Sequence, residues 1–259
     1  MRKTALITGA SSGIGYELAM IHAQKGDNLV LVSRNHIKLN EIKSHMELSY
    51  AISVMVIKID LSEPDSAQEL YDQLKKDHVV VDYLINNAGF GYHGLFMETE
   101  WQREEKMINL HITTLTHLCK LFGKDMIERG CGRILNVTST AAFQPGPSMS
   151  VYFASKAYIL HFSEALNKEF FANGVSVTAL CPGPTNSEFQ KNADLEGSNL
   201  FRILPVSNAR EVARYAHKAM IKGKAVAVHG WINKMIVLSL RFVPRKLVVF
   251  FSGLLLSKS

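Results

Sequence analysis

A tyrosine and a lysine four residues apart are the side chains in this sequence with the clearest capacity for chemistry. Tyr152 and Lys156 belong to the segment V-Y-F-A-S-K, and on a helix two residues at this spacing share one face. A nearby ammonium group favours the tyrosinate, so we expect Lys156 to lower the pKa of the phenol from about 10 toward neutrality. Ser139 follows an apolar run at residues 134–137, and its hydroxyl can hold a substrate carbonyl oxygen. Together these residues predict proton transfer at a carbonyl or alcohol oxygen.

A glycine-rich loop follows the first apolar run of the chain. Residues 8–15 read T-G-A-S-S-G-I-G, and a helical pattern begins directly after them. Glycines let the backbone turn tightly and approach a pyrophosphate, whose charge the helix N-terminus stabilises. The spacing T-G-x-x-x-G-x-G differs from the G-x-G-x-x-G of many other dinucleotide-binding proteins. The loop predicts a dinucleotide cofactor held by Gly9, Ser11, Ser12, Gly13, Ile14 and Gly15.

The end of the second apolar run indicates which dinucleotide binds. An acidic residue there would hydrogen-bond the ribose 2′-hydroxyl and indicate NAD, but residues 31–35 read L-V-S-R-N. No carboxylate repels a 2′-phosphate, and the Arg34 guanidinium can hold one, so we expect NADP(H) in preference to NAD(H). Asp60, after the third run, is expected to accept a hydrogen bond from the adenine amino group, with Leu61 beside it.

Short β-rich runs alternate along the chain with longer stretches of helical spacing. The runs are residues 4–8, 29–33, 53–59, 83–86, 133–138, 175–181 and 225–229, and the helical stretches include 15–24, 64–76, 101–127 and 151–172. This alternation predicts a parallel sheet covered on both faces, whose carboxyl edge collects the loops described above. We therefore expect an α/β fold: a single doubly wound Rossmann domain of about seven parallel strands with helices on both faces, plus a C-terminal helical tail.

The charge of the chain is concentrated near its C-terminus. The 259 residues are 47% hydrophobic and 20% charged, which excludes a disordered chain and a disulfide miniprotein. Residues 1–190 carry 17 Lys and Arg against 20 Asp and Glu, whereas residues 191–259 carry 12 against 3. A nucleic-acid-binding protein would more often spread basic residues over its main domain, so we expect no nucleic-acid partner.

The cysteines and histidines indicate neither a disulfide framework nor a metal site. Cys119, Cys131 and Cys181 form no C-x-x-C pair and leave an odd count, which is typical of reduced thiols in the cytoplasm. The ten histidines show no zinc-binding spacing. We therefore expect a cytoplasmic protein without a metal.

Five motifs occur in a fixed order along the chain. They are T-G-x-x-x-G-x-G at residues 8–15, N-N-A-G at 86–89, a serine at 139, Y-x-x-x-K at 152–156 and P-G at 182–183. In this order and spacing the sequence resembles the short-chain dehydrogenases/reductases of the roughly 250-residue type, over about residues 3–230. The resemblance implies NAD(P)-dependent oxidoreduction of a carbonyl or alcohol. It also implies cofactor contacts from Asn87, Ala88, Gly89, Tyr152, Lys156, Pro182, Gly183 and Thr185.

The resemblance assigns catalytic roles to Asn109, Ser139, Tyr152 and Lys156. Tyr152 would be the acid in reduction and the base in oxidation, and Lys156 would lower its pKa and hold the nicotinamide ribose. Ser139 would position the carbonyl oxygen, and Asn109 would support a proton-relay water for Lys156. In this family, Ser-Arg at the end of the second strand accompanies the phosphorylated cofactor, although many such members have a second basic residue where this chain has Ser12.

The segment after the P-G motif, residues 184–208, is expected to close over the substrate. Phe189 in this segment and Phe143 beside the catalytic strand would contact the substrate together with Ser139 and Tyr152. Aromatic and aliphatic residues in such a lid favour an apolar substrate. The alternative, that these side chains simply pack against the body of the protein, stays open.

Residues 231–259 are expected to form a tail beyond the catalytic domain of residues 1–230. A spanning helix needs about 20 consecutive apolar residues, and the stretch from Arg241 through Lys246, which contains Pro244, interrupts the apolar sequence. Two short helices joined near Pro244 fit better. They either cover the substrate pocket or a subunit interface, or lie on an anionic membrane surface.

The sequence thus predicts an NADP(H)-dependent oxidoreductase that reduces an apolar ketone or oxidises the corresponding secondary alcohol, with the proton supplied by Tyr152. We expect a homo-oligomer, a dimer or a tetramer, in the cytoplasm or peripheral at the membrane. The alternative function is a non-catalytic dinucleotide-binding sensor or interaction protein on the same fold. A sugar-nucleotide epimerase is disfavoured by the chain length and the glycine spacing.

Overall fold

Seven short strands align in parallel at the centre of the molecule, and all but the two edge strands are buried along most of their length. The computed structural model describes residues 2–257, so residues 258–259 of the expected tail lie outside it. The sheet has the order β3-β2-β1-β4-β5-β6-β9. Its strands are β1 (Thr4–Thr8), β2 (Asn28–Ser33), β3 (Val54–Lys58), β4 (Tyr83–Asn86), β5 (Gly132–Val137), β6 (Val175–Cys181) and β9 (Val226–Val228). This order confirms the predicted doubly wound sheet, and no strand end differs by more than one residue from the expected one.

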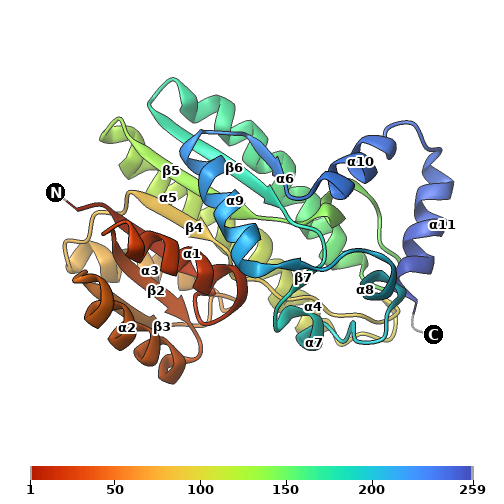
Figure 1. Ribbon diagram of the computed structural model, residues 1–259, viewed down its shortest axis with the longest axis horizontal. Helices are drawn as coiled ribbons and strands as arrows, with labels where there is room; N and C mark the ends of the chain where they lie inside the picture. Colours follow the sequence, from red (N-terminus) through yellow and green to blue (C-terminus); the bar gives the residue numbers. More distant parts are fainter. Residues whose placement is uncertain (1, 258–259) are drawn as a thin grey trace.

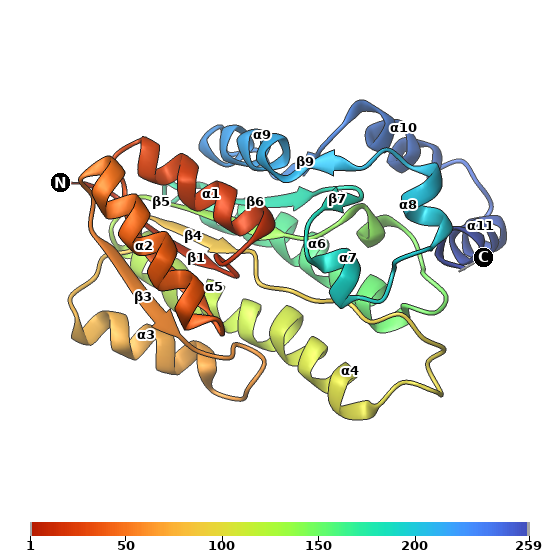
Figure 2. The same cartoon turned by 60° about the horizontal axis from the view of Figure 1, so that its bottom comes forward.

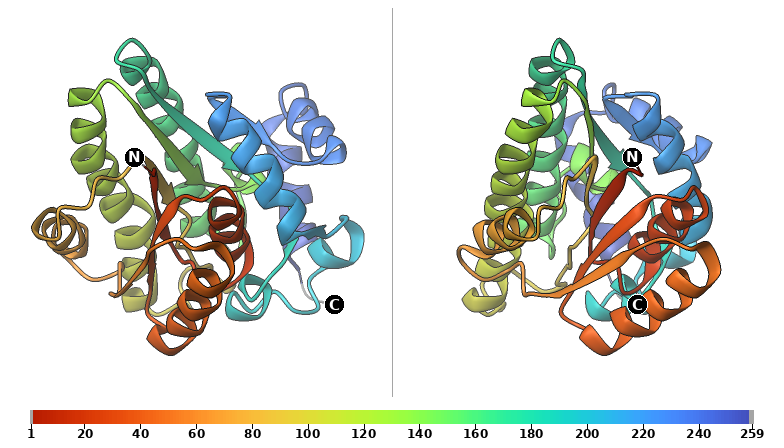
Figure 3. Two further views of the ribbon diagram at one scale, coloured as in Figure 1. Left: turned by 60° about the vertical axis from the view of Figure 1, so that its left-hand side comes forward. Right: turned by 90° about the vertical axis from the view of Figure 1, so that its left-hand side faces the viewer.

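Helices cover both faces of the sheet, as Figure 3 shows in its right-hand view. The residues of β1 alternate between the two layers: Ile7 packs with the first and Leu6 with the second. The first layer contains α1 (Gly13–Gln24), α2 (His36–Tyr50) and α9 (Ala209–Ile221), and the second contains α3 (Ser66–Lys76), α5 (Leu115–Glu128) and α6 (Ser150–Phe171). Burial on both sides explains why the strands read as nearly continuous apolar runs.

The stretch expected as one helix over residues 101–127 is interrupted. Helix α4 (Trp101–Ile108) leads into a π-helical turn (Asn109–Thr114), and α5 continues from it. Such a turn inserts one extra residue into an α-helix and is frequent at functional sites. Here it begins at the asparagine that was expected to act in catalysis.

The segment after β6 crosses the carboxyl edge of the sheet, as Figure 2 shows. It contains two short parallel strands, β7 (Thr185–Asn186) and β8 (Ser207–Asn208), with α7 (Phe189–Asn192) and α8 (Asn199–Ile203) between them. A 3-10 turn (Thr140–Phe143) follows β5 at the same edge. The loops after β1, β4, β5 and β6 therefore meet at one side of the molecule.

The expected helical tail consists of α10 (Trp231–Ser239) and α11 (Arg245–Leu256), which lie together at one end of the molecule in Figures 1 and 2. Pro244 directly precedes α11, as expected for a residue that is compatible with a helix start. Helix α11 packs against α8, and the Ser252 hydroxyl donates a hydrogen bond to the Pro145 carbonyl at 2.7 Å. Within residues 2–257 no helix has both the length and the apolar character to cross a bilayer.

Candidate active site

The glycine-rich loop after β1 is bound tightly to the loop after β4. The Nδ2 group of Asn87 donates to the carbonyls of Thr8 and Gly9 at 3.0 and 3.1 Å. The backbone N–H groups of Asn87 and Ala88 both donate to the Thr8 hydroxyl at 2.9 Å. Gly9 has φ +64°, and a Cβ there would lie 2.9 Å from the Cα of Ala88. Only glycine permits this approach, which holds the two loops at one edge of the cleft.

Helix α1 begins at the same loop and directs its first backbone N–H groups toward the cleft. Ser12, at the N-cap, makes no side-chain capping bond to these groups. The N-terminus of a helix with free amides and a positive dipole end is suited to a pyrophosphate. Gly15 does not line the cleft, although we expected it to touch the cofactor. A Cβ at Gly15 would lie 2.3 Å from the Gly9 carbonyl oxygen, so any side chain at position 15 would clash with the loop.

The end of β2 has no acidic side chain, and it is followed by an arginine whose side chain is largely exposed. The Arg34 side chain is 74% exposed, and its Nη1 lies 3.8 Å from Oδ2 of Asp60. The other oxygen of Asp60 accepts hydrogen bonds from the Ser62 backbone and hydroxyl at 3.0 and 2.7 Å. Burial raises the pKa of Asp60, but the Ser62 hydrogen bonds and Arg34 outweigh it, so the pKa lies below its ordinary value. The Asp60 carboxylate is therefore ionised near neutral pH. Its Oδ1 accepts the Ser62 hydrogen bonds, whereas its Oδ2 makes the longer, 3.8 Å contact with Arg34.

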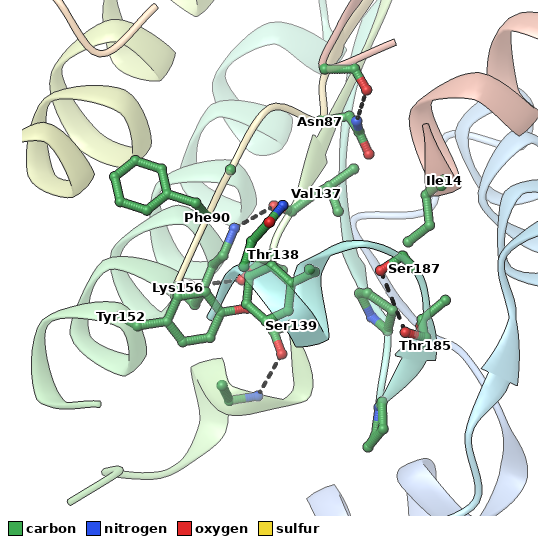
Figure 4. A pocket seen from close by; sticks show the side chains of 18 of the residues that line it. Ile14, Asn87, Phe90, Val137, Thr138, Ser139, Tyr152, Lys156, Thr185 and Ser187 are labelled. Atoms are coloured by element: carbon green, nitrogen blue, oxygen red, sulfur yellow. Dashed lines mark hydrogen bonds between the residues drawn. The ribbon is translucent and has the colours of Figure 1, made fainter. Parts of the chain in front are cut away.

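Tyr152 and Lys156 on α6 meet Ser139 at the carboxyl end of β5, as Figure 4 shows. The Lys156 ammonium donates to the Val137 carbonyl at 3.1 Å and lies 5.6 Å from the centroid of the Tyr152 ring. Ser139 caps the 3-10 turn, with its Oγ accepting from the Ala141 N–H at 3.1 Å. The structure thus brings together three of the four residues expected to be catalytic.

The pKa of Tyr152 moves in the direction opposite to the one expected from the sequence. Burial raises the pKa of Tyr152 to about 12, and the hydrogen bond with the Ser139 hydroxyl opposes this only in part. Burial also lowers the pKa of Lys156 to about 7. The expected lowering by a neighbouring ammonium does not appear because removal from water dominates for both groups. Tyr152 is therefore a protonated phenol at neutral pH.

His111, which the sequence did not identify, ties the start of α6 to the π-helical turn. The Phe90 N–H donates to Nε2 of His111 at 3.3 Å, so Nδ1 carries the ring hydrogen and donates to the Ser155 hydroxyl at 2.9 Å. Ser155 in turn donates to the Tyr152 carbonyl at 2.8 Å. Burial, together with Lys156, holds the pKa of His111 well below its usual range. A neutral imidazole thereby helps to fix the backbone of α6 at Tyr152.

Asn109 is half-buried at the first position of the π-helical turn and does not line the cleft. Its neighbour Leu110 does. The role of Asn109 in a water relay therefore stays a prediction. Within residues 2–257 no three His, Cys, Asp or Glu side chains lie close enough together to hold a metal ion.

The cleft has a volume of about 390 Å³ and runs from the glycine-rich loop to the tail. It is lined by these expected cofactor and substrate residues: Gly9, Ser11, Ser12, Gly13, Ile14, Arg34, Asp60, Leu61, Asn87, Ala88, Gly89, Ser139, Tyr152, Lys156, Pro182, Gly183, Thr185 and Phe189. Phe143 is placed elsewhere, in contrast to our expectation. The 3-10 turn directs it to the opposite side, where it packs with Leu160 and lines a second cavity beside α6.

The wall of the cleft beyond Tyr152 is apolar and includes side chains from the tail. Ile236 and Val237 of α10, Leu240 directly after it, and Leu255 and Leu256 of α11 line it. From the lid come Phe189, Leu195, Leu200, Phe201 and Leu204, and from the body Phe90, Met149 and Phe153. The hydrophobicity of the tail was visible in the sequence, but its position over the cleft depends on contacts with α8 and with the 3-10 turn.

The parallel sheet has the doubly wound order of a Rossmann fold, and Ser139, Tyr152 and Lys156 lie together at its carboxyl edge. The family model described as short chain dehydrogenase matches residues 3–197, and the chain belongs to this family.

Three curated relatives are partly similar to this chain. Probable oxidoreductase EphD of Mycobacterium tuberculosis is 32% identical over 178 residues, which are 68% of this chain and 30% of that protein. Very-long-chain 3-oxoacyl-CoA reductase of Anas platyrhynchos is 31% identical, with 69% of this chain and 58% of that protein covered. 17-beta-hydroxysteroid dehydrogenase type 3 of Mus musculus is 34% identical, with 70% and 60% covered. The chain thus spans between 30% and 60% of the length of these relatives.

Two solved structures are similar over nearly the whole chain. A short-chain dehydrogenase from Sphingobium yanoikuyae in complex with NADPH is 30% identical, with a TM-score of 0.82 and coverage of 93% of this chain and 94% of that one. The bulky-bulky ketone specific alcohol dehydrogenase from Comamonas testosteroni is 29% identical, with a TM-score of 0.78 and coverage of 93% and 92%. The similarity therefore extends beyond the segment that the family model matches.

Proposed function

We propose that this protein is an NADP(H)-dependent reductase of apolar ketones. The observation that carries the proposal is the placement of Tyr152, Lys156 and Ser139 at the junction of two parts of one cleft. On one side lie the glycine-rich loop and Arg34, and on the other lies the apolar wall made by the lid and the tail. A carbonyl held at this junction would face the cofactor on one side and the phenol on the other.

The residues on the cofactor side fit a phosphorylated dinucleotide. The free N–H groups at the start of α1 suit the pyrophosphate, and the exposed Arg34 guanidinium is positioned to hold a 2′-phosphate. The end of β2 offers no carboxylate that would bind a 2′-hydroxyl or repel the phosphate. The solved relative in complex with NADPH is in keeping with this choice.

The reduction divides between cofactor and protein. When bound, the nicotinamide supplies a hydride to the carbonyl carbon. Tyr152 donates its phenolic proton to the carbonyl oxygen, and its high pKa keeps that proton in place until charge develops on the oxygen. Ser139 donates a hydrogen bond to the same oxygen. Lys156 is held by the Val137 carbonyl, and the tyrosinate that forms beside it favours the charged form of its amine, which stabilises that tyrosinate in turn.

The substrate would be an apolar carbonyl compound or the corresponding alcohol. Aliphatic and aromatic side chains from α8, α10 and α11 surround the space beyond Tyr152, and burying apolar substrate surface there would supply binding free energy. Relatives named as a 3-oxoacyl-CoA reductase, a 17-beta-hydroxysteroid dehydrogenase and a bulky ketone dehydrogenase are consistent with such a substrate.

The proposal is tested by measuring NADPH oxidation with a panel of acyl, steroid and small aromatic ketones. We expect turnover with at least one apolar ketone, and a loss of about 10²-fold or more in kcat for Tyr152→Phe with NADPH affinity retained. NADPH binding without turnover on any ketone, and no effect of Tyr152→Phe, would instead support a non-catalytic sensor.

We also propose a cytoplasmic homo-oligomer, a dimer or a tetramer. The three cysteines are free thiols in the structure, and two of them are buried, which suits a reducing compartment. Light scattering coupled to size-exclusion chromatography would give the number of chains directly. A monomer at all concentrations would contradict the proposed assembly.

A further inference from the structure

The tail exposes a row of large apolar side chains on each of its helices. They recur at helical spacing, three or four residues apart, so each row occupies one face. Their exposed fractions lie between 47% and 81%, whereas most such residues elsewhere in the chain are buried. The α10 row is Trp231, Met235 and Leu238, continued by Phe242 after the helix, and the α11 row is Leu247, Phe250, Phe251 and Leu254.

The opposite faces of the same helices are already occupied by the protein. Ile236 of α10, Leu240 directly after it, and Leu255 and Leu256 of α11 line the cleft, and Val248 is buried. The exposed rows are therefore not needed to hold the tail in place and remain available for a partner. Soluble monomers rarely expose large contiguous apolar patches, and such patches mark interaction sites.

The charges around these rows indicate the chemistry of the partner. Lys234, Arg241, Arg245 and Lys246 are exposed, and residues 212–257 contain no aspartate or glutamate. None of the four forms an ion pair with a carboxylate of residues 2–257. Exposed apolar side chains bordered by uncompensated cations match a bilayer containing anionic lipids.

A second copy of the chain is a poorer partner for this face. A twofold interface brings the same surface patch of both copies together, so these cations would face cations. Like charges at an interface lower affinity unless anions lie between them. The mixture of apolar and purely basic groups therefore favours a lipid surface over self-association.

We propose that α10 and α11 dock the protein on an anionic membrane surface. The two exposed rows enter the headgroup region, and the four cations contact lipid phosphates. Because the inner faces of the same helices wall the cleft, docking places the apolar end of the cleft beside the bilayer. An apolar substrate dissolved in the membrane would then reach Tyr152 with little exposure to water.

Vesicle co-sedimentation of the full-length protein tests the docking. We expect binding to vesicles of phosphatidylcholine with phosphatidylglycerol, weaker binding to phosphatidylcholine alone, and weakening by salt. The double variant Phe250→Ser/Phe251→Ser should bind anionic vesicles at least about tenfold more weakly. Arg245→Glu/Lys246→Glu should lose the preference for phosphatidylglycerol.

The matched control is Ile37→Ser/Leu48→Ser, which removes two apolar side chains that are even more exposed than the phenylalanines, from α2, far from the tail in Figure 1. It should bind vesicles as the wild type does, and all variants should keep the wild-type thermal unfolding midpoint. The proposal is overturned if the wild type does not bind anionic vesicles, or if the phenylalanine variant binds as well as the control. A wild-type dimer that becomes monomeric in the phenylalanine variant would show instead that a second copy covers this face.

A second measurement addresses substrate delivery and rests on the proposed reductase function. With a ketone carried in anionic vesicles, Phe250→Ser/Phe251→Ser should raise KM about tenfold, while KM for a water-soluble ketone stays unchanged. Equal KM values for wild type and variant with the vesicle-borne ketone would refute delivery. Failure of all ketones would refute the reductase function and leave the vesicle-binding result to decide the docking.

Discussion

Replacing Arg34 by alanine should weaken NADPH binding and leave NADH binding unchanged. The Arg34 side chain is 74% exposed, and its ionic contact with Asp60 is 3.8 Å long, so its loss should cost the fold little. A guanidinium about 4 Å from a phosphate gains ~1 kcal/mol per phosphate charge in water and ~4 kcal/mol at an effective dielectric constant of 20. Because the position is solvated, we take ~2 kcal/mol as the total attraction between the guanidinium and the 2′-phosphate, so its loss should raise the Kd for NADPH roughly thirtyfold.

Fluorescence titration of both dinucleotides against wild type and variants measures this effect. Lys58→Ala is the matched control, because Lys58 is exposed and paired in register with Ser33 on the neighbouring strand but does not line the cleft. Its removal should change either Kd by less than about twofold, since an exposed charge that makes no contact in the cleft is screened by solvent and salt. The reasoning is refuted if Arg34→Ala weakens NADPH and NADH equally, or weakens neither.

Three further predictions concern stability, the glycine-rich loop and Ser139. Burial lowers the pKa of His217 to about 4, so its contribution to stability is complete above pH 6.5 and is lost as the pH falls toward 4. Urea unfolding should show that the free energy of unfolding falls by ~2 kcal/mol over that pH range, a value reduced to allow for partial hydration of the side chain. His217→Asn should remove this pH dependence. A variant with the same pH dependence as the wild type would contradict the assignment to His217. The Glu188 carboxylate accepts a hydrogen bond from the Ser12 hydroxyl at 3.0 Å, so Glu188→Gln should tighten NADPH binding about threefold by removing a charge beside the phosphates. Weaker binding, measured by the same titration, would show that the carboxylate instead orders the loop. Ser139→Ala should lower kcat/KM about a hundredfold, whereas Ser139→Thr keeps both the donor and the cap on the Ala141 N–H and should retain most activity. Equal steady-state losses in the two variants would contradict the role of the hydroxyl as the donor.

Much of the fold could be predicted because its signals are local. Residues 4–8, 83–86 and 175–181 begin and end as strands where the sequence indicates, since each apolar run is bounded by residues that break it. The interruption of the helix at Asn109 left no such signal, because residues 101–127 keep helical spacing throughout. A π-helical turn depends on packing of α4 and α5 against different neighbours.

The sequence by itself determined that a glycine loop, Ser139 and the Tyr152–Lys156 pair would meet at one sheet edge. The alternation of strands and helices requires this, because parallel strands all end on the same side. Only the tertiary structure decided that burial raises the pKa of Tyr152, that Phe143 faces away from the cleft, and which faces of α10 and α11 remain exposed. These properties depend on atoms that are distant along the chain, so spacing within a segment carries no information about them.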